Sequence, residues 1–258
     1  MRRRLLAILL SLALPLAAAP AAAQAPAIAA AADLKFALAE LADRFKAATG
    51  REVRVAFGSS GNFTQQIENG APFELFLSAD EGYVERLAAK GLTRDAGVLY
   101  AIGRVVLFVP AGSSLKADPT LADLRAAIGD GRLKRFAIAN PEHAPYGRAA
   151  RETLQAAGLW DAIRPALVLG ENVAQATQFA AGGNAQGGIV ALALTKTPEV
   201  ARLGTAVLLP ASMHKPLRQR MVLMRNAGPV AAEFFAWLQT KPAREVFVRH
   251  GFALPGED

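Results

Sequence analysis

The residues best placed to do chemistry lie at four junctions, where an apolar segment leads through a small or polar turn into an amphipathic segment. These junctions are residues 31–33 (AAD), 59–62 (SSGN), 145–147 (PYG) and 171–173 (ENV). A helix that begins at such a turn leaves backbone N–H groups unpaired and partly positive. Several helix N-termini aimed at one cleft would bind an anion without any Lys or Arg. Taken singly, each junction is equally typical of a plain helix cap.

The side-chain patterns of common enzymes are missing from this sequence. The chain has no Cys, and His143, His214 and His250 lie far apart, without the spacing of metal ligands. We interpret each histidine as a surface or loop residue. There is no G-x-S-x-G motif, and residues 58–61 (GSSG) lack the Gly-Lys-Ser/Thr ending of a phosphate-binding loop. We therefore expect a protein that is not an enzyme, with no catalytic residues, no resident metal and no cofactor.

The first residues are typical of a secretory signal peptide. Arg2, Arg3 and Arg4 precede an apolar stretch over residues 5–16, and a small-residue zone with A-x-A cleavage options follows. The apolar stretch is too short for a membrane-spanning helix. We predict that a signal peptide over residues 1–23 is cleaved on export, which places the mature protein in the periplasm. Without Cys, neither a lipid anchor nor a disulfide is expected.

The charge distribution argues against a nucleic-acid partner. The formal net charge of +7 includes the three arginines of the predicted signal peptide. The remaining Lys and Arg are scattered, with no basic run and little aromatic interleaving. A mildly positive surface would still steer anions toward the protein.

Short apolar strands alternate with amphipathic helices along most of the chain. We expect strands at 27–31, 53–57, 74–78, 136–139, 188–192 and 221–224. We expect helices at 34–49, 62–68, 81–90, 121–128, 148–157, 174–181, 230–239 and 242–250. This β-α-β rhythm predicts parallel sheets covered by helices.

A long apolar run over residues 100–109 could cross between two lobes. We therefore predict an α/β protein with two lobes, each a mostly parallel sheet flanked by helices, joined by two crossing segments. The first lobe would hold residues 24–103 and 216–258, and the second residues 104–215.

Several segments around the junctions are distinctive. They are residues 57–61 (FGSSG), 66–73 (QIENGAPF), 75–80 (LFLSAD), 100–103 (YAIG), 140–147 (NPEHAPYG) and 251–252 (GF). In these segments the chain resembles the periplasmic molybdate-binding proteins of ABC importers, a branch of the type II solute-binding fold, over essentially the whole mature chain. The resemblance implies a monomer that captures molybdate or tungstate as an oxyanion in an interlobe cleft and delivers it to an ABC transporter membrane permease.

The resemblance also implies which residues bind the oxyanion. Ser60 would donate its hydroxyl and amide, Tyr146 and Val173 would donate backbone amides, and Asp33 would lie at the first-lobe turn. Supporting positions would be Ala32, Ser59 (as a cap), Gly61 and Asn172. Some members also donate a Tyr hydroxyl after the Gly-Ile-Val strand; Ala191 stands at that position here, so the chain resembles the branch without that Tyr.

Asp33 departs from the family pattern, because relatives place Ser, Thr or Asn at this turn. At about 4 Å and an effective dielectric near 20, an ionised Asp33 would repel a dianion by roughly 8 kcal/mol. Micromolar binding is itself worth about 8 kcal/mol. The carboxylate could turn away and cap its own helix, could be protonated and donate, or could accept a proton carried by the ligand. We favour the cap, because Asp is a good N-cap residue.

Three alternatives stay open at this point. The same fold could bind another small oxyanion such as phosphate or sulfate, with Asp33 accepting a ligand proton. An enzyme could pair the carboxylates of Asp33 and Glu68, although nothing in the sequence brings them together. An exported sensor or adhesion module could keep the fold without transport.

Overall fold

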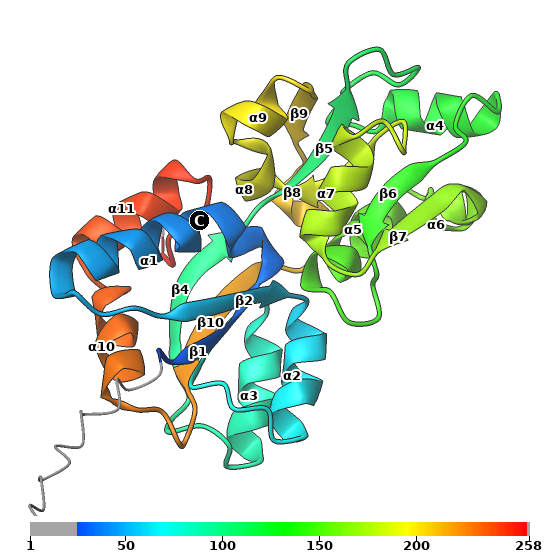
Figure 1. Cartoon of the computed structure of the whole chain (residues 1–258). Helices are drawn as coiled ribbons and strands as arrows, with labels where there is room; N and C mark the ends of the chain where they lie inside the picture. Colours follow the sequence, from blue (N-terminus) through cyan, green and yellow to red (C-terminus); the bar gives the residue numbers. More distant parts are fainter. Residues whose placement is uncertain (1–24, 257–258) are drawn as a thin grey trace, which may run out of the picture.

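The chain folds into two lobes, each built around a five-stranded sheet (Figure 1). The computed structural model describes residues 25–256, so the predicted signal peptide over residues 1–23 lies outside the described residues. Helices flank both sheets, which confirms the predicted two-lobed α/β architecture. Within residues 25–256, the helices are too short or too polar to cross a membrane.

The first sheet has the strand order β2-β1-β3-β10-β4. Its strands are β1 (Ala27–Ala31), β2 (Arg54–Gly58), β3 (Leu75–Ser78), β4 (Val98–Gly103) and β10 (Leu217–Leu223). β1 pairs in parallel with β2 and β3, while β10 runs antiparallel to β3 and β4. The predicted parallel pairing therefore describes the β2-β1-β3 part of a mixed sheet. The carboxyl ends of these three strands meet at one edge, where open α/β sheets bind ligands.

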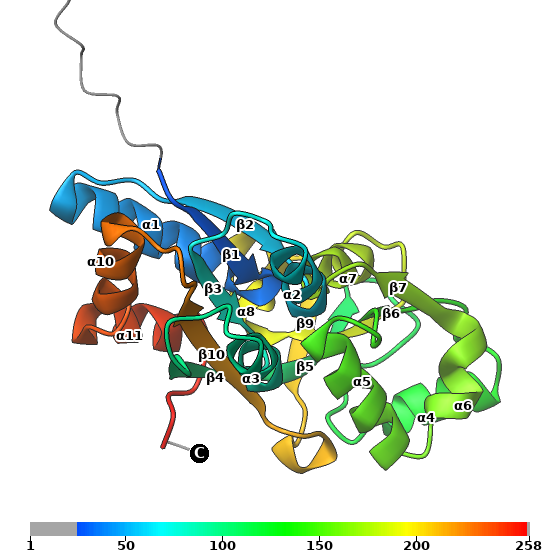
Figure 2. The same cartoon turned by 90° about the horizontal axis from the view of Figure 1, so that it is seen from below.

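Helices cover both faces of the first sheet (Figures 1 and 2). They are α1 (Lys35–Thr49), α10 (Pro229–Trp237) and α11 (Lys241–Arg249) on one face, and α2 (Ser60–Glu68) and α3 (Glu81–Ala89) on the other. Ile28 and Ala30 of β1 pack in the core under the first three helices, while Ala29 packs under α2 and α3. Successive side chains of a strand point to opposite faces, so β1 is buried on both sides.

The second sheet repeats this pattern of strand directions, in the order β7-β6-β8-β5-β9. Its strands are β5 (Val105–Pro110), β6 (Phe136–Ala139), β7 (Leu167–Gly170), β8 (Gly188–Ala191) and β9 (Gly204–Leu208). β6 is parallel to β7 and β8, and β5 is antiparallel to β8 and β9. The carboxyl ends of its parallel strands again share one edge.

In the described part of the second lobe, three helices have eight or more residues and three have four. They are α4 (Ala122–Gly129), α5 (Pro145–Ala156), α6 (Trp160–Ile163), α7 (Val173–Ala181), α8 (Leu192–Thr195) and α9 (Pro198–Ala201). α5 and α7 contact strands β6 and β8. Three 3-10 turns complete the described elements: η1 (Ala32–Leu34), η2 (Arg164–Ala166) and η3 (Ala211–Met213).

Two segments connect the lobes (Figure 1). The predicted apolar run is two strands in different sheets, since β4 ends at Gly103 and β5 begins at Val105. The return connection, residues 209–216, links β9 to β10. Both connections are short, so the lobes stay adjacent.

Two helices begin two or three residues earlier than the sequence pattern predicted. α5 was expected from Arg148 and begins at Pro145, because Pro suits the first position of a helix. α2 was expected from Asn62 and begins at Ser60. Ser60 and Tyr146 therefore lie in first turns, where backbone N–H groups lack helical partners.

Candidate functional site

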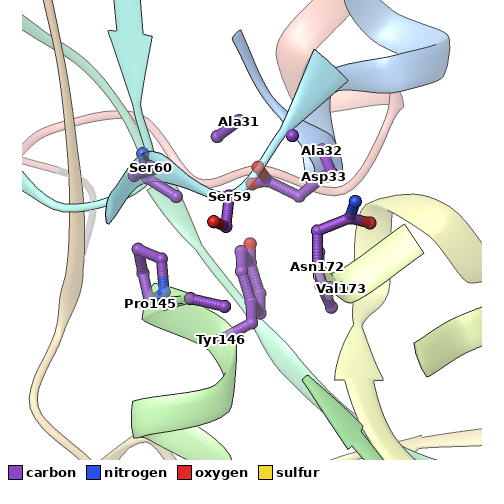
Figure 3. Close-up of a pocket in the computed structure, with 12 residues that line it drawn as sticks. Ala31, Ala32, Asp33, Ser59, Ser60, Pro145, Tyr146, Asn172 and Val173 are labelled. Atoms are coloured by element: carbon purple, nitrogen blue, oxygen red, sulfur yellow. Dashed lines mark hydrogen bonds between the residues drawn. The ribbon is translucent and has the colours of Figure 1, made fainter. Parts of the chain in front are cut away.

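One cavity between the lobes brings the four junctions together (Figure 3). Its lining consists of Ala31, Ala32, Asp33, Gly58, Ser59, Ser60 and Ala79 from the first lobe, and Ala144, Pro145, Tyr146, Asn172 and Val173 from the second. The space between these atoms is about 190 Å³, including the part open to solvent. Of the eight binding and supporting residues that the sequence analysis named, all except Gly61 line this cavity.

The two serines at the start of α2 make different contacts. Ser59 is the N-cap: its Oγ accepts from the Asn62 N–H at 3.4 Å and lies 2.9 Å from His143 Nδ1. Ser60 Oγ accepts from the Ala79 N–H at 3.0 Å, which leaves its own proton free to donate into the cavity. The Ser60 N–H makes no hydrogen bond to the described residues. Ser60 therefore offers the cavity two donors.

The N-termini of α5 and α7 face the same cavity from the second lobe. Tyr146 is the second residue of α5, and Val173 is the first residue of α7. Neither backbone N–H bonds to another residue within 25–256. The Asn172 side chain accepts from the next two amides of α7 at 3.0 and 3.1 Å. This cap leaves the Val173 N–H as the free donor at that helix end.

Asp33 does not cap a helix, so the sequence interpretation that we favoured is wrong. It is the second residue of η1, and neither η1 nor α1 receives a side-chain cap hydrogen bond. The residue is 1 % exposed, and its carboxyl points toward the middle of the lining residues (Figure 3). Oδ2 accepts from Gln219 Nε2 at 2.5 Å, while Oδ1 has no hydrogen-bond partner among the described residues.

Burial raises the pKa of Asp33 from 3.8 to about 6. Donors around the carboxyl offset part of this rise, namely the Gln219 side chain, the Tyr146 hydroxyl and the amides of Asp33 and Leu34. The lining residues include no Lys or Arg that would hold the carboxyl ionised.

A buried polar network holds the Asp33 carboxyl in this orientation. Tyr100 Oη donates to Gln219 Oε1 at 2.7 Å, which turns Gln219 Nε2 toward Asp33. The same Nε2 lies 3.4 Å from Tyr146 Oη, so the network joins the two lobes. Burial raises the pKa of both tyrosines well above 10, so both remain neutral.

Sequence reasoning missed Gln219 and Tyr100, and it assigned only the backbone amide of Tyr146. Gln219 could have been recognised from its position in the alternating pattern of β10. Leu217, Gln219 and Met221 alternate along β10 and are each 0 % exposed, so Gln219 is a polar residue in a buried row. The strand was predicted only from Met221 onward, and this left Gln219 outside it.

Direct contacts join the lobes at the rim of the cavity. The Gly61 N–H donates to the His143 carbonyl oxygen at 2.9 Å. Gly61, expected to support the ligand, thus contacts the other lobe instead, and His143 is a loop residue with an interlobe contact. Two further side-chain pairs join the lobes: Asn62 with Glu171, and Arg148 with Asp80. The structure therefore has its lobes in contact around the cavity.

The cavity presents hydrogen-bond donors and one carboxyl group. Donors from helix N-termini suit a small anion. Pairing of Asp33 with Glu68 is contradicted, because Glu68 binds Arg86 and Lys90 at the far end of α2 and does not line the cavity. Among residues 25–256, no three His, Asp or Glu side chains are grouped to hold a metal ion.

Two α/β lobes that meet around a donor-lined cavity define a solute-binding architecture, in which domain closure surrounds a ligand. Comparison of the sequence with known protein families agrees with the assignment as a solute-binding protein. Residues 27–253 match the model of the bacterial extracellular solute-binding proteins, and the chain belongs to this family.

The similar proteins are named as binding proteins. A molybdate-binding protein of Rhodobacter capsulatus is 36% identical over 216 residues, which cover 83% of this chain and 82% of the relative. One from Azotobacter vinelandii is 36% identical over 231 residues, covering 88% and 89%. The solved periplasmic molybdate-binding protein of Azotobacter vinelandii superposes with a TM-score of 0.80 at 30% identity, over 89% of this chain and 99% of that one.

Proposed function

We propose that this protein captures molybdate in the cavity between its lobes and delivers it to an ABC permease in the inner membrane. The observation that carries the proposal is the convergence of the N-termini of α2, α5 and α7 on a cavity lined by no Lys or Arg. Helix dipoles and unpaired amides stabilise an anion there. The relatives named as molybdate-binding proteins favour molybdate among the possible anions.

In this proposal, donors from both lobes replace the hydration shell of the anion. Ser60 donates its hydroxyl and amide, and Tyr146 and Val173 donate their amides. Ala32, Ser59 and Asn172 shape the cavity, and Gly61 lets the lobes approach. Tungstate has nearly the same size, shape and charge as molybdate, so we expect this donor set to bind both.

The protein would act as a monomer in the periplasm, after removal of residues 1–23. A lobe of residues 24–103 and 216–258 would rotate toward a lobe of residues 104–215 about the two connections. The open form would admit the anion, and the closed form would be the one presented to the permease. The role is transport without chemical conversion, which fits relatives that are named as binding proteins.

Isothermal titration calorimetry of the purified mature protein tests the proposal, with molybdate, tungstate, sulfate and phosphate as ligands. We expect tight binding of molybdate and tungstate at one site per chain, with much weaker binding of the other two anions. Elemental analysis of the protein as purified should find molybdenum or tungsten. Tight binding of phosphate or sulfate without molybdate binding would contradict the proposal.

A further inference from the structure

We propose that Asp33 binds the oxyanion as a neutral carboxylic acid, so that capture of a dianion takes up one proton from solution. The inference rests on the proposed function and describes how the same cavity tolerates a carboxyl group beside a doubly charged ligand. It makes Asp33 a donor, like the amides and the Ser60 hydroxyl.

The first ground is the unpartnered oxygen of Asp33. The residue is 1 % exposed, and Oδ1 makes no hydrogen bond to the described residues. An ionised carboxylate buried with one oxygen unpaired is costly, because burial removes the hydration of that oxygen and no hydrogen bond replaces it. A proton on Oδ1 removes the charge and creates a donor toward the cavity that Asp33 lines. An oxyanion in the cavity would accept from that donor.

The second ground is the fixed direction of Gln219. Its Oε1 accepts from Tyr100, so its Nε2 donates to Asp33 Oδ2. Oδ2 is therefore already an acceptor, and a proton on the carboxyl belongs on Oδ1. Gln219 Nε2 donates more strongly to a carboxylate, but it can also donate to the carbonyl oxygen of a carboxylic acid, so the network accommodates the neutral form without rearrangement.

The third ground is the set of charges around Asp33. The titratable groups that face it are Tyr146 from α5 and Tyr100 from β4, and both are neutral. Of the other elements that contact η1, α7 and α8 contain no titratable side chain, and Arg54 of β2 is exposed at the opposite end of that strand. The nearest cation along the chain, Lys35, is exposed. We therefore expect the carboxyl of Asp33 to be neutralised by a proton when a dianion binds beside it.

The sign of the pH dependence follows from the proton count. Burial already raises the pKa of Asp33 to about 6, and a dianion in contact raises it further. At a pH above the value in the free protein, the complex holds one proton more than its separated components. Affinity for molybdate should then fall by up to tenfold for each unit of pH, and level off below about pH 6.

The decisive experiment is calorimetry with molybdate at about pH 8, in two buffers that differ in enthalpy of ionisation. The difference between the observed binding enthalpies counts the protons taken up, and we expect a value approaching one. The matched variant is Asp33→Asn, whose amide can donate to the ligand while its carbonyl accepts from Gln219. It should take up no proton through this residue and bind molybdate more tightly than the wild type at about pH 8. The two affinities should converge toward about pH 6.

Two further variants serve as controls for this interpretation. Glu68→Gln removes a carboxylate outside the cavity and should leave the proton count and the affinity unchanged. Asp33→Leu removes the donor while keeping a similar size, and it should bind molybdate more weakly than Asp33→Asn at every pH. Thermal unfolding of each variant verifies that it is folded before binding is measured.

The possible failures are distinguishable. If the wild type binds molybdate without proton uptake and with an affinity independent of pH, Asp33 does not change its protonation state on binding, and the inference is overturned while the proposed function stands. Persistent uptake of one proton in Asp33→Asn would assign the proton to another group and overturn the inference too. If neither the wild type nor Asp33→Asn binds molybdate at any pH, both the proposed function and this inference are contradicted.

Discussion

Replacing Gly61 by Ala tests whether the contact between the lobes contributes to ligand binding. A Cβ at this position would stand 2.6 Å from the His143 carbonyl oxygen and 3.0 Å from its Cα. The lobes could then no longer approach as they do, and the 2.9 Å hydrogen bond from the Gly61 N–H would be lost. Overpacking costs about 1–3 kcal/mol, and a lost hydrogen bond costs about 0.5–1.5 kcal/mol. Together these costs predict molybdate binding weaker by roughly 10- to 1000-fold.

The stability of the ligand-free protein should not fall in parallel. Gly61 is the second residue of α2, and Ala is favoured over Gly in helices by up to about 1 kcal/mol. The closest contacts of the added Cβ are all with His143 in the opposite lobe, which would move away in the proposed open form. Calorimetry should therefore show weaker binding, while thermal unfolding without ligand is unchanged or shifted upward. The control is Gly129→Ala in α4, where an added Cβ meets no atom within 4 Å. Wild-type affinity in Gly61→Ala would refute closure at this contact.

Three further predictions concern the cavity. Ser60→Ala should weaken molybdate binding by roughly 10- to 100-fold in calorimetry. It should also lower the free energy of unfolding by about 1–3 kcal/mol, because the Ala79 N–H loses its acceptor. Unchanged affinity would show that the Ser60 side chain does not bind the anion. Ser59→Ala should lower the free energy of unfolding by about 1 kcal/mol through loss of the α2 cap, with a smaller effect on binding than Ser60→Ala. Asp33 binds more protons folded than unfolded, because burial raises its pKa from 3.8 to about 6. Its contribution to the free energy of unfolding should therefore fall by about 2 kcal/mol as the pH rises from about 4 to about 6. Urea unfolding of the wild type and Asp33→Asn at both pH values should show this difference, and parallel pH profiles would contradict the pKa.

Local patterns predicted the buried elements well. Strand β1 has the predicted bounds, and α1 ends at Thr49 with Gly50 as its C-cap. The φ of 70° at Gly50 is the left-handed conformation that glycine adopts readily. Strands β7 and β9 lie at sheet edges and were missed. β7 has only four residues, too few to show alternation, and β9 is mostly exposed. The four-residue helices α6, α8 and α9 are too short to show helical periodicity.

By itself, the sequence determined the kinds of groups that the site could offer. Four strand-to-helix turns, the Ser59–Ser60 pair and the unusual Asp33 are local features, and a helix N-terminus leaves unpaired amides wherever it lies in the fold. The tertiary structure decided which of these groups meet. Gln219 reaches Asp33 across 186 residues of sequence, and His143 reaches Gly61 from the other lobe. The ionisation of Asp33 likewise depends on burial, since removal of water raises the pKa of a carboxyl. The extent of that burial is set by residues from both lobes, so it could not be predicted from the sequence around Asp33.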